Sequence, residues 1–128
     1  MRAIAQTAYG AFAVDLDTEE VEPTASVEAD PPLKLSLPRV VASASVGSTI
    51  VAVVDRKPPL VVSHDAGITW RETGGGLPPG FAVAIAEDNP DVVVYASRNR
   101  LHVSTNGGVF WRALSAELPE IEALAVET

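Results

Sequence analysis

The stretch that decides the fold is Ser63-His64-Asp65-Ala66-Gly67-Ile68-Thr69-Trp70, which is repeated forty-one residues later as Ser104-Thr105-Asn106-Gly107-Gly108-Val109-Phe110-Trp111. The repeat extends beyond the octet. Leu77-Pro78 precedes an apolar segment at 82–85, and Leu118-Pro119 precedes one at 123–126, again forty-one residues on. A third copy begins at Leu37-Pro38, forty residues before the first of these. A period of about forty residues indicates a repeat protein.

Between these landmarks the chain is rich in Val and Ile and is interrupted by Gly, Pro, Asn and Asp, a composition that predicts short strands. The middle repeat predicts strands at 40–46, 49–55, 60–63 and 68–72. The last repeat predicts them at 81–87, 91–97, 101–104 and 109–113. Four antiparallel strands in about forty residues is the size of one β-propeller blade, and no segment has the 3.6-residue period of a helix.

The N-terminal region fits the same frame when Phe12 to Asp17 is aligned with Leu60 to Asp65. Strands are then predicted at 2–8 and 20–24, on either side of a strand that runs into a degenerate octet. The first strand of this blade is missing, and Met1 corresponds to Pro90. The last residues, 121–128, form a first strand with nothing after it, and Thr128 corresponds to Glu87.

These two defects complement each other, so we expect one complete structural unit over residues 1–128. Blade 1 comprises residues 1–36 with strand 121–128, blade 2 comprises residues 37–76, and blade 3 comprises residues 77–120. Three blades cannot close a ring, because propellers have four to eight. The prediction is an all-β homodimer closed as a six-bladed ring, in which each C-terminal strand completes the partner's first blade and no sheet edge is left open.

The octet resembles the Asp box, Ser-x-Asp-x-Gly-x-Thr-Trp, of BNR or sialidase-type β-propellers. The same motif occurs in sortilin-like receptors, xyloglucan hydrolases and a photosystem II assembly factor. The first copy matches at every fixed position, through Ser63, Asp65, Gly67, Thr69 and Trp70. The second copy keeps Ser104, Gly108 and Trp111 but has Asn106 and Phe110 at the other two positions. The resemblance implies a propeller whose boxes lie on the face away from the active site.

The residues of the octet favour a structural turn. The Asp65 carboxylate can accept hydrogen bonds from backbone N–H groups of its own hairpin, Gly67 can supply a positive φ, and the indole can cover the turn. The alternative is that Trp70 and Trp111 form a platform on which a sugar stacks.

The sequence favours a non-catalytic binding or interaction module. A glycosidase or sialidase-like enzyme is the alternative, but the resemblance carries over no catalytic residue, and Tyr95 lies among valines where packing is expected. His64 and His102 each stand alone, so no metal site or cofactor is predicted. A third possibility is an assembly factor that docks on a protein complex.

The candidate ligand site consists of two short cationic loops at equivalent repeat positions, which contain Arg56, Lys57, Arg98, Asn99 and Arg100. Blades place such loops on one face, so we expect an anionic partner there: a small molecule, a glycan or an acidic protein segment. The alternative is that these are solvated turn tips. A net charge of −8 argues against nucleic acid or an anionic membrane as partner. The chain has no long apolar run and no signal peptide pattern, so a cytoplasmic location is the default expectation. The absence of cysteine excludes disulfides and thiolate metal sites but does not choose between compartments.

Overall fold

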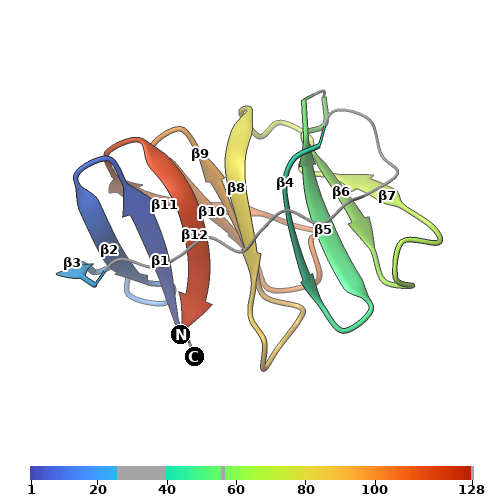
Figure 1. Cartoon of the computed structure of the whole chain (residues 1–128), viewed down its shortest axis with the longest axis horizontal. Coiled ribbons are helices and arrows are strands. Elements are labelled where there is room, and N and C mark those ends of the chain that lie inside the picture. Colours follow the sequence, from blue (N-terminus) through green and yellow to red (C-terminus); the bar gives the residue numbers. More distant parts are fainter. Residues whose placement is uncertain (26–39, 56, 128) are drawn as a thin grey trace.

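The computed structural model describes residues 1–25, 40–55 and 57–127. Every regular element in these residues is a strand (Figure 1). The described residues contain no helix that is long and apolar enough to cross a membrane. The strands are β1 (Arg2–Thr7), β2 (Gly10–Asp15), β3 (Val21–Thr24), β4 (Val40–Val46), β5 (Thr49–Val54), β6 (Leu60–Ser63), β7 (Arg71–Thr73), β8 (Gly80–Ile85), β9 (Val93–Ser97), β10 (Arg100–Ser104), β11 (Arg112–Glu117) and β12 (Ile121–Glu127).

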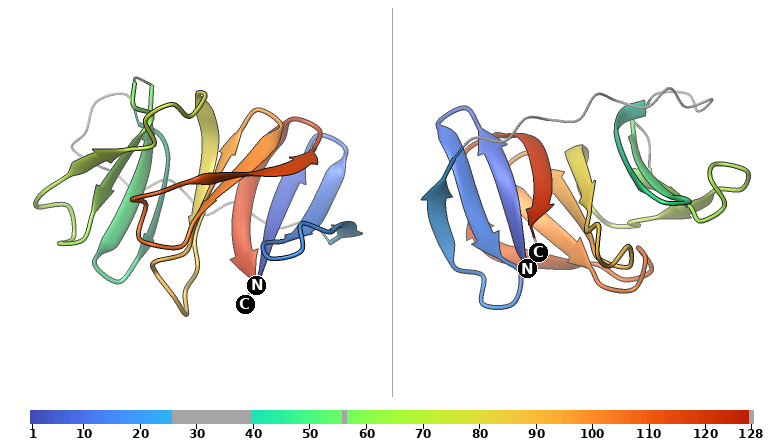
Figure 2. Two further views of the ribbon diagram at one scale, coloured as in Figure 1. Left: turned by 180° about the vertical axis from the view of Figure 1, so that it is seen from behind. Right: turned by 60° about the horizontal axis from the view of Figure 1, so that its bottom comes forward.

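The strands form three antiparallel sheets of four strands each, so the predicted all-β architecture is confirmed. Sheet 1 has the order β12-β1-β2-β3, sheet 2 the order β4-β5-β6-β7, and sheet 3 the order β8-β9-β10-β11. Sheet 3 lies in the middle, because β8 contacts β12 on one side and β4 on the other. Figures 1 and 2 show the three sheets side by side, with sheets 1 and 2 at the two ends.

Sheet 1 is completed by the last strand of the chain. β12 pairs with β1 from Arg2 opposite Glu127 to Thr7 opposite Ile121, and the two chain ends lie side by side (Figures 1 and 2). The sequence predicted a partner's strand at this place. In this single chain the place is filled by the chain's own β12, so the exchange between two chains remains a proposal.

Most strands lie where the repeat predicted them, with one systematic difference. β7 begins at Arg71 and β11 at Arg112, whereas strands were predicted from 68 and 109. The reason is that the second half of each octet is still turn. Its residues up to the tryptophan are held by hydrogen bonds to the octet's own side chains, so the backbone becomes extended only after Trp70 and Trp111.

The predicted register of the first sheet was wrong by one residue. Leu60 pairs with Val53, next to the Val54–Pro59 hydrogen bond that closes the β5–β6 connection. The corresponding residue in sheet 1 is Ala11, which pairs with Gln6 next to the Thr7–Gly10 pair that closes the β1–β2 turn. The alignment had placed Phe12 there. Because side chains alternate across a strand, a slip of one residue moves each side chain to the other face. Phe12 therefore packs into the core between sheets 1 and 3.

Two apolar cores join the sheets. One lies between sheets 2 and 3 and is built from Val51, Val53, Leu60, Val62, Val83, Ile85, Val93 and Tyr95. The other lies between sheets 3 and 1 and includes Val92, Val94, Leu101, Val103, Leu114, Ala3, Ala5 and Val14. Each sheet of a propeller-like stack must bury its faces against its neighbours, and sheet 3 buries both. The faces of sheets 1 and 2 that point away from sheet 3 carry only small clusters of their own.

Tyr95 is the largest fully buried side chain in the described part of the chain, and it fixes the packing of sheet 3. Its hydroxyl donates to the Pro78 carbonyl at 2.6 Å, and its ring packs edge-on against Trp111 with centroids 6.2 Å apart. The ring passes directly over Gly80: a Cβ at Gly80 would lie 2.1 Å from the tyrosine ring.

Gly80→Ala should therefore destabilise the fold by about 1–3 kcal/mol, because the buried ring has to move from its packed position. The measurement is the free energy of unfolding by denaturant titration. Gly75→Ala is the matched control, since a Cβ at Gly75 meets nothing within 4 Å, and it should unfold like the parent. Equal destabilisation by the two variants would contradict the role given to Tyr95.

Candidate functional site

The first octet is a turn held by its own polar side chains. The Asp65 carboxylate accepts from the Thr69 N–H at 2.8 Å and from the Ser63 hydroxyl at 2.7 Å, and its second oxygen accepts from the Thr69 hydroxyl. The Ser63 hydroxyl oxygen also accepts from the Gly67 N–H at 2.8 Å. The three donors from Thr69 and Ser63 stabilise the charged form, so the pKa of Asp65 falls to about 2. This carboxylate is committed to the turn and is not available as an acid or base.

The second octet makes the same turn with an amide in place of the carboxylate. The Asn106 Oδ1 accepts from the Phe110 N–H at 3.0 Å and from the Ser104 hydroxyl at 2.9 Å, and the Gly108 N–H donates to the Ser104 oxygen at 2.9 Å. Asparagine can therefore replace aspartate here, because a single side-chain oxygen accepts both hydrogen bonds of this turn, from the Ser104 hydroxyl and the Phe110 N–H. The second octet has no counterpart of the Thr69 hydroxyl bond, since Phe110 stands at that position.

Both tryptophans are half-buried and pack against apolar clusters through one side of the ring. The Trp70 Nε1 donates to the Gly67 carbonyl at 3.1 Å, and the Trp111 Nε1 donates to the Gly108 carbonyl at 3.0 Å. Trp70 packs on the cluster of Ala52, Val54 and Val61, whereas Trp111 packs on the core between sheets 2 and 3. These contacts favour a packing role for both rings over a sugar platform.

Some side chains of the predicted cationic loops are exposed, and one is held in an ion pair. Lys57, Arg98 and Asn99 are exposed, whereas Arg100 forms an ion pair with Glu117 at 3.0 Å. Arg56 lies outside the described residues. The turn at 98–99 also has a structural role, because its two carbonyls accept from the N–H groups of Ile121 and Leu118 at 2.8 Å. The side chains that point to solvent here are therefore anchored on a turn that holds the entry to β12.

The two histidines lie in different environments. His64 is exposed in the first octet, within 3.4 Å of the Thr49 hydroxyl. His102 is buried on β10, where its ring lies 5.7 Å from that of Tyr95. Its Nε2 lies 3.3 Å from the Ser97 hydroxyl, and its Nδ1 is buried without a hydrogen-bond partner. Burial, helped by the nearby charge of Arg100, lowers the pKa of His102.

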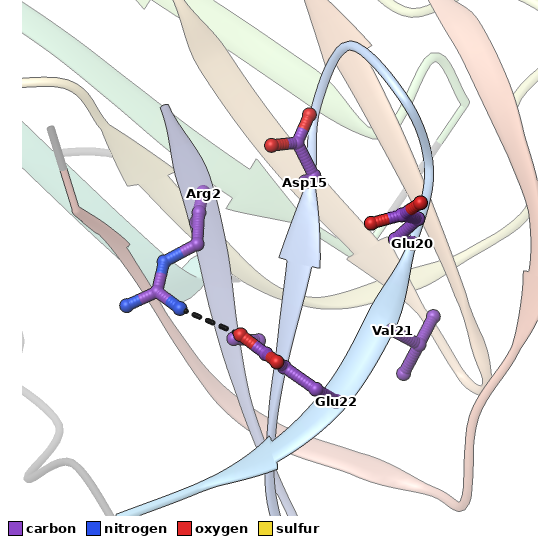
Figure 3. Close-up of a pocket in the computed structure, with 6 residues that line it drawn as sticks. Arg2, Asp15, Glu20, Val21 and Glu22 are labelled. Carbon is purple, nitrogen blue, oxygen red and sulfur yellow. Dashed lines mark hydrogen bonds and ion pairs between the residues drawn. The ribbon is translucent and has the colours of Figure 1, made fainter.

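A shallow pocket on sheet 1 was not anticipated from the sequence (Figure 3). It has a volume of about 340 Å³ and is lined by Arg2, Ala13, Asp15, Glu20, Val21 and Glu22. Arg2 bridges three strands through Glu22 at 3.0 Å and Glu127 at 2.7 Å, and these partners raise its pKa. No spacing in the sequence signals this triad, because Arg2 and Glu127 are brought together only by the pairing of β1 with β12.

A second hollow of about 250 Å³ lies beside the first octet and is lined by Val62, His64, Asp65, Thr69, Trp70 and Arg71. Within residues 1–25, 40–55 and 57–127 there is no group of three or more metal-ligating side chains.

Comparison with known proteins identifies the architecture. The chain resembles YCF48 from Cyanidioschyzon merolae, with a TM-score of 0.52 and 21% identity over 91% of this chain and 34% of the other. It resembles the GH74 enzyme of Niastella koreensis with the same TM-score, 19% identity, and coverage of 91% and 18%. A structure of YCF48 bound to D1 peptide gives a TM-score of 0.52 and 17% identity, with coverage of 94% and 42%.

These neighbours are β-propeller proteins, so the fold of this chain is of the β-propeller type. The chain spans about a third of the first YCF48 chain and about a fifth of the GH74 chain. No family model and no curated protein matches the sequence. At these identities the likeness establishes the fold alone.

The environment of His102 predicts a loss of stability in mild acid. The unfolded chain binds a proton on this histidine near pH 6.5, whereas the folded chain binds it only at lower pH. The free energy of unfolding should therefore be highest, as far as His102 determines it, above pH 6.5, and it should fall as the pH is lowered toward the folded-state pKa of this histidine. Denaturant unfolding of the parent at pH 7.5 and pH 5.5 measures this loss.

His102→Phe should remove most of that pH dependence. Phenylalanine is chosen because β2 has Phe12 at the equivalent position: Phe12 lies opposite Ala5, as His102 lies opposite Tyr95. His64→Asn leaves His102 in place and should retain the loss. If the parent and His102→Phe lose equal stability between the two pH values, the buried histidine is not its source.

Proposed function

We propose that this protein is a non-catalytic binding module, in which two chains close a six-bladed Asp-box propeller that binds a partner molecule. The observation that carries the proposal is the pairing of β12 with β1. This pairing makes three blades of four strands from a chain whose first sheet would otherwise lack its inner strand. Propellers need at least four blades to close, and two such halves make six.

Exchange of β12 between two chains is the form of closure that we favour. The hydrogen bonds between β12 and β1 are the same whether the strand comes from the same chain or from a partner. β3 ends at Thr24 in sheet 1 and β4 begins at Val40 in sheet 2, and these sheets lie on opposite sides of sheet 3 in the single chain. In an exchanged ring, sheets 1 and 2 of the same chain would be neighbours, so the connection would join adjacent blades.

The ligand surface that we propose is the end of the sheets that carries Lys57, Arg98 and Asn99. Their side chains are exposed, and the backbone of the 98–99 turn is fixed by its two hydrogen bonds, so little ordering is needed on binding. Arg100 contributes less to this surface because Glu117 already neutralises it. Arg56 belongs to the same proposal by its position in the sequence. An acidic protein segment is the ligand class that we favour over a small anion or a glycan.

Two alternatives have different support. A role as an assembly factor that docks on a protein complex is compatible with the likeness to a propeller that has been captured with a bound peptide. A glycosidase role has the likeness to a GH74 enzyme, at 19% identity. Hydrolysis of a xyloglucan or sialoside substrate that is abolished by changing a single carboxylate would favour the enzyme.

The two-chain ring predicts a solution mass of twice 13.4 kDa, and a cysteine pair tests strand exchange. The chain has no cysteine, and Ala3 lies opposite Val126, within the Cα separation that a disulfide spans. Ala3→Cys with Val126→Cys should give a covalent dimer on a non-reducing gel if β12 is exchanged. It should give a cross-linked monomer if β12 stays with its own chain.

The control pair is Ala3→Cys with Ala123→Cys. Ala123 lies opposite Gln6, about 10 Å along the strand from Ala3, so this pair should form neither product within the ring. A parent protein that is monomeric at all concentrations would exclude the two-chain ring.

The proposed ligand surface predicts salt-sensitive binding of an acidic peptide such as oligoglutamate. Arg98→Ala should weaken binding roughly tenfold, because it removes a charge-assisted hydrogen bond, and raising the salt concentration should weaken binding by the parent. Arg100→Ala is the matched control and should have a smaller effect, since Glu117 holds that side chain. Calorimetric titration at two salt concentrations measures both. Equal binding by the parent and Arg98→Ala would show that these residues are only solvated turn tips.

A further inference from the structure

The joint between sheets 2 and 3 contains a buried polar contact in addition to its apolar core. The Thr73 hydroxyl on β7 donates to the Gly108 carbonyl in the second octet, and its oxygen accepts from the Trp111 Nε1 at 3.2 Å. Thr73 is buried, so this contact fixes the turn of one sheet against the last strand of the sheet before it.

The register of sheet 1 places another threonine at the same position. Thr73 pairs with Leu60, and Leu60 pairs with Val53, next to the Val54–Pro59 hydrogen bond that closes the β5–β6 connection. Thr24 pairs with Ala11, and Ala11 pairs with Gln6, one pair inside the β1–β2 turn. Thr24 is therefore the counterpart of Thr73, on the face of sheet 1 that points away from sheet 3.

The first octet has the counterpart of the tryptophan. Trp70 stands forty-one residues before Trp111, and its Nε1 donates to the Gly67 carbonyl as Trp111 donates to Gly108. Among the described residues no threonine contacts this indole as Thr73 contacts Trp111. Trp70 lies on the face of sheet 2 that points away from sheet 3.

The two outer faces also carry apolar clusters that each belong to a single sheet. Sheet 1 has Ile4, Ala11 and Ala13 with Ala125, and sheet 2 has Ala52, Val54 and Val61 with Trp70. The other two clusters found among the described residues each join two sheets. The outer clusters therefore repeat the inner joints in position, although they are smaller and most of their residues are already buried in the single chain. Sheet 3 lies between them in the single chain.

We infer that a second copy of this chain completes the ring by bringing the Thr24 face of sheet 1 onto the Trp70 turn of sheet 2. The contact repeats the inner joint: the Thr24 hydroxyl donates to the Gly67 carbonyl and accepts from the Trp70 Nε1. This inference rests on the proposed two-chain ring. If β12 is exchanged between the chains, Thr24 and Trp70 of each contact belong to the same chain. If β12 stays with its own chain, they belong to different copies. In either case the contact exists only in the dimer.

The first test compares substitutions at the two joints. Thr24→Val removes the hydroxyl with both of its proposed hydrogen bonds and keeps the shape of the side chain. Trp70→Phe removes the indole N–H together with part of the ring. Each should raise the dimer dissociation constant, measured by analytical ultracentrifugation, roughly threefold to tenfold. Thr73→Val and Trp111→Phe are the matched controls, which should lower the melting temperature with a smaller effect on the dissociation constant, because their joint lies within the chain.

The second test is a cysteine pair at the contact itself. A Cβ on Gly108 would lie 3.7 Å from the Thr73 Cγ2, so Thr73→Cys with Gly108→Cys is the internal reference. Gly67 and Gly108 have nearly equal positive φ of 92° and 91°, so a cysteine carries the same backbone strain at either position. Thr24→Cys with Gly67→Cys should therefore form a disulfide to an extent similar to the reference pair. The disulfide should lie within one chain where the Ala3 and Val126 pair gives covalent dimers, and between chains where that pair does not.

Suppose that the parent is dimeric, that Thr24→Val and Trp70→Phe dissociate like the parent, and that the Thr24 and Gly67 cysteines stay reduced while the reference pair oxidises. These results would overturn this inference and leave the ring proposal standing. A parent that is monomeric at every concentration would overturn the two-chain ring and this contact together.

Discussion

The arrangement of the sheets depends on the pairing of the last strand with the first. Every other strand pair in the described residues joins neighbours in the sequence, so each of those hairpins forms from local contacts. The β1–β12 ladder instead closes a separation of more than a hundred residues, and that closure has to offset the entropy of ordering the chain between them. Because β12 also contacts β8, the same strand fixes sheet 1 against sheet 3.

The two octets show how a short motif can stop one strand and start another with little help from the core. Two successive residues in each turn have positive φ, Ala66 and Gly67 in the first and Gly107 and Gly108 in the second. Alanine tolerates this conformation less readily than glycine, so the first turn carries a backbone cost that the second avoids. The fully matched polar set around Asp65 offsets this cost, whereas the second octet combines a weaker polar set with an unstrained backbone.

The sequence predicted the hairpins well because their signals are local: the apolar runs, the turn residues and the forty-one-residue period. The register of sheet 1 was wrong by one, because Asp15 lies in a turn of a different kind, in which its carboxylate accepts from the N–H groups two and three residues on. In the candidate site, sequence alone could not reveal that Glu117 pairs with Arg100, since β10 and β11 meet there across a shift in register. Nor could it reveal the unpaired Nδ1 of His102, because hydrogen bonding of a buried ring depends on the packing around it.

The composition of the joints limits how a ring of such halves can behave. The joint between sheets 2 and 3 buries Leu60, several valines and Tyr95, whereas the outer cluster of sheet 1 consists of three alanines with Ile4. The outer cluster of sheet 2 has Val54, Val61 and Trp70 with Ala52, so the small side chains of a closing joint come from sheet 1. Burial stabilises in proportion to apolar area, at about 25 cal/mol per Å², so small side chains contribute less per position. The closing joints would therefore be weaker than the joints within each chain. The fraction of chains assembled in the proposed ring would therefore increase with protein concentration. Each dissociated half would keep the packing of sheet 3 against sheets 1 and 2.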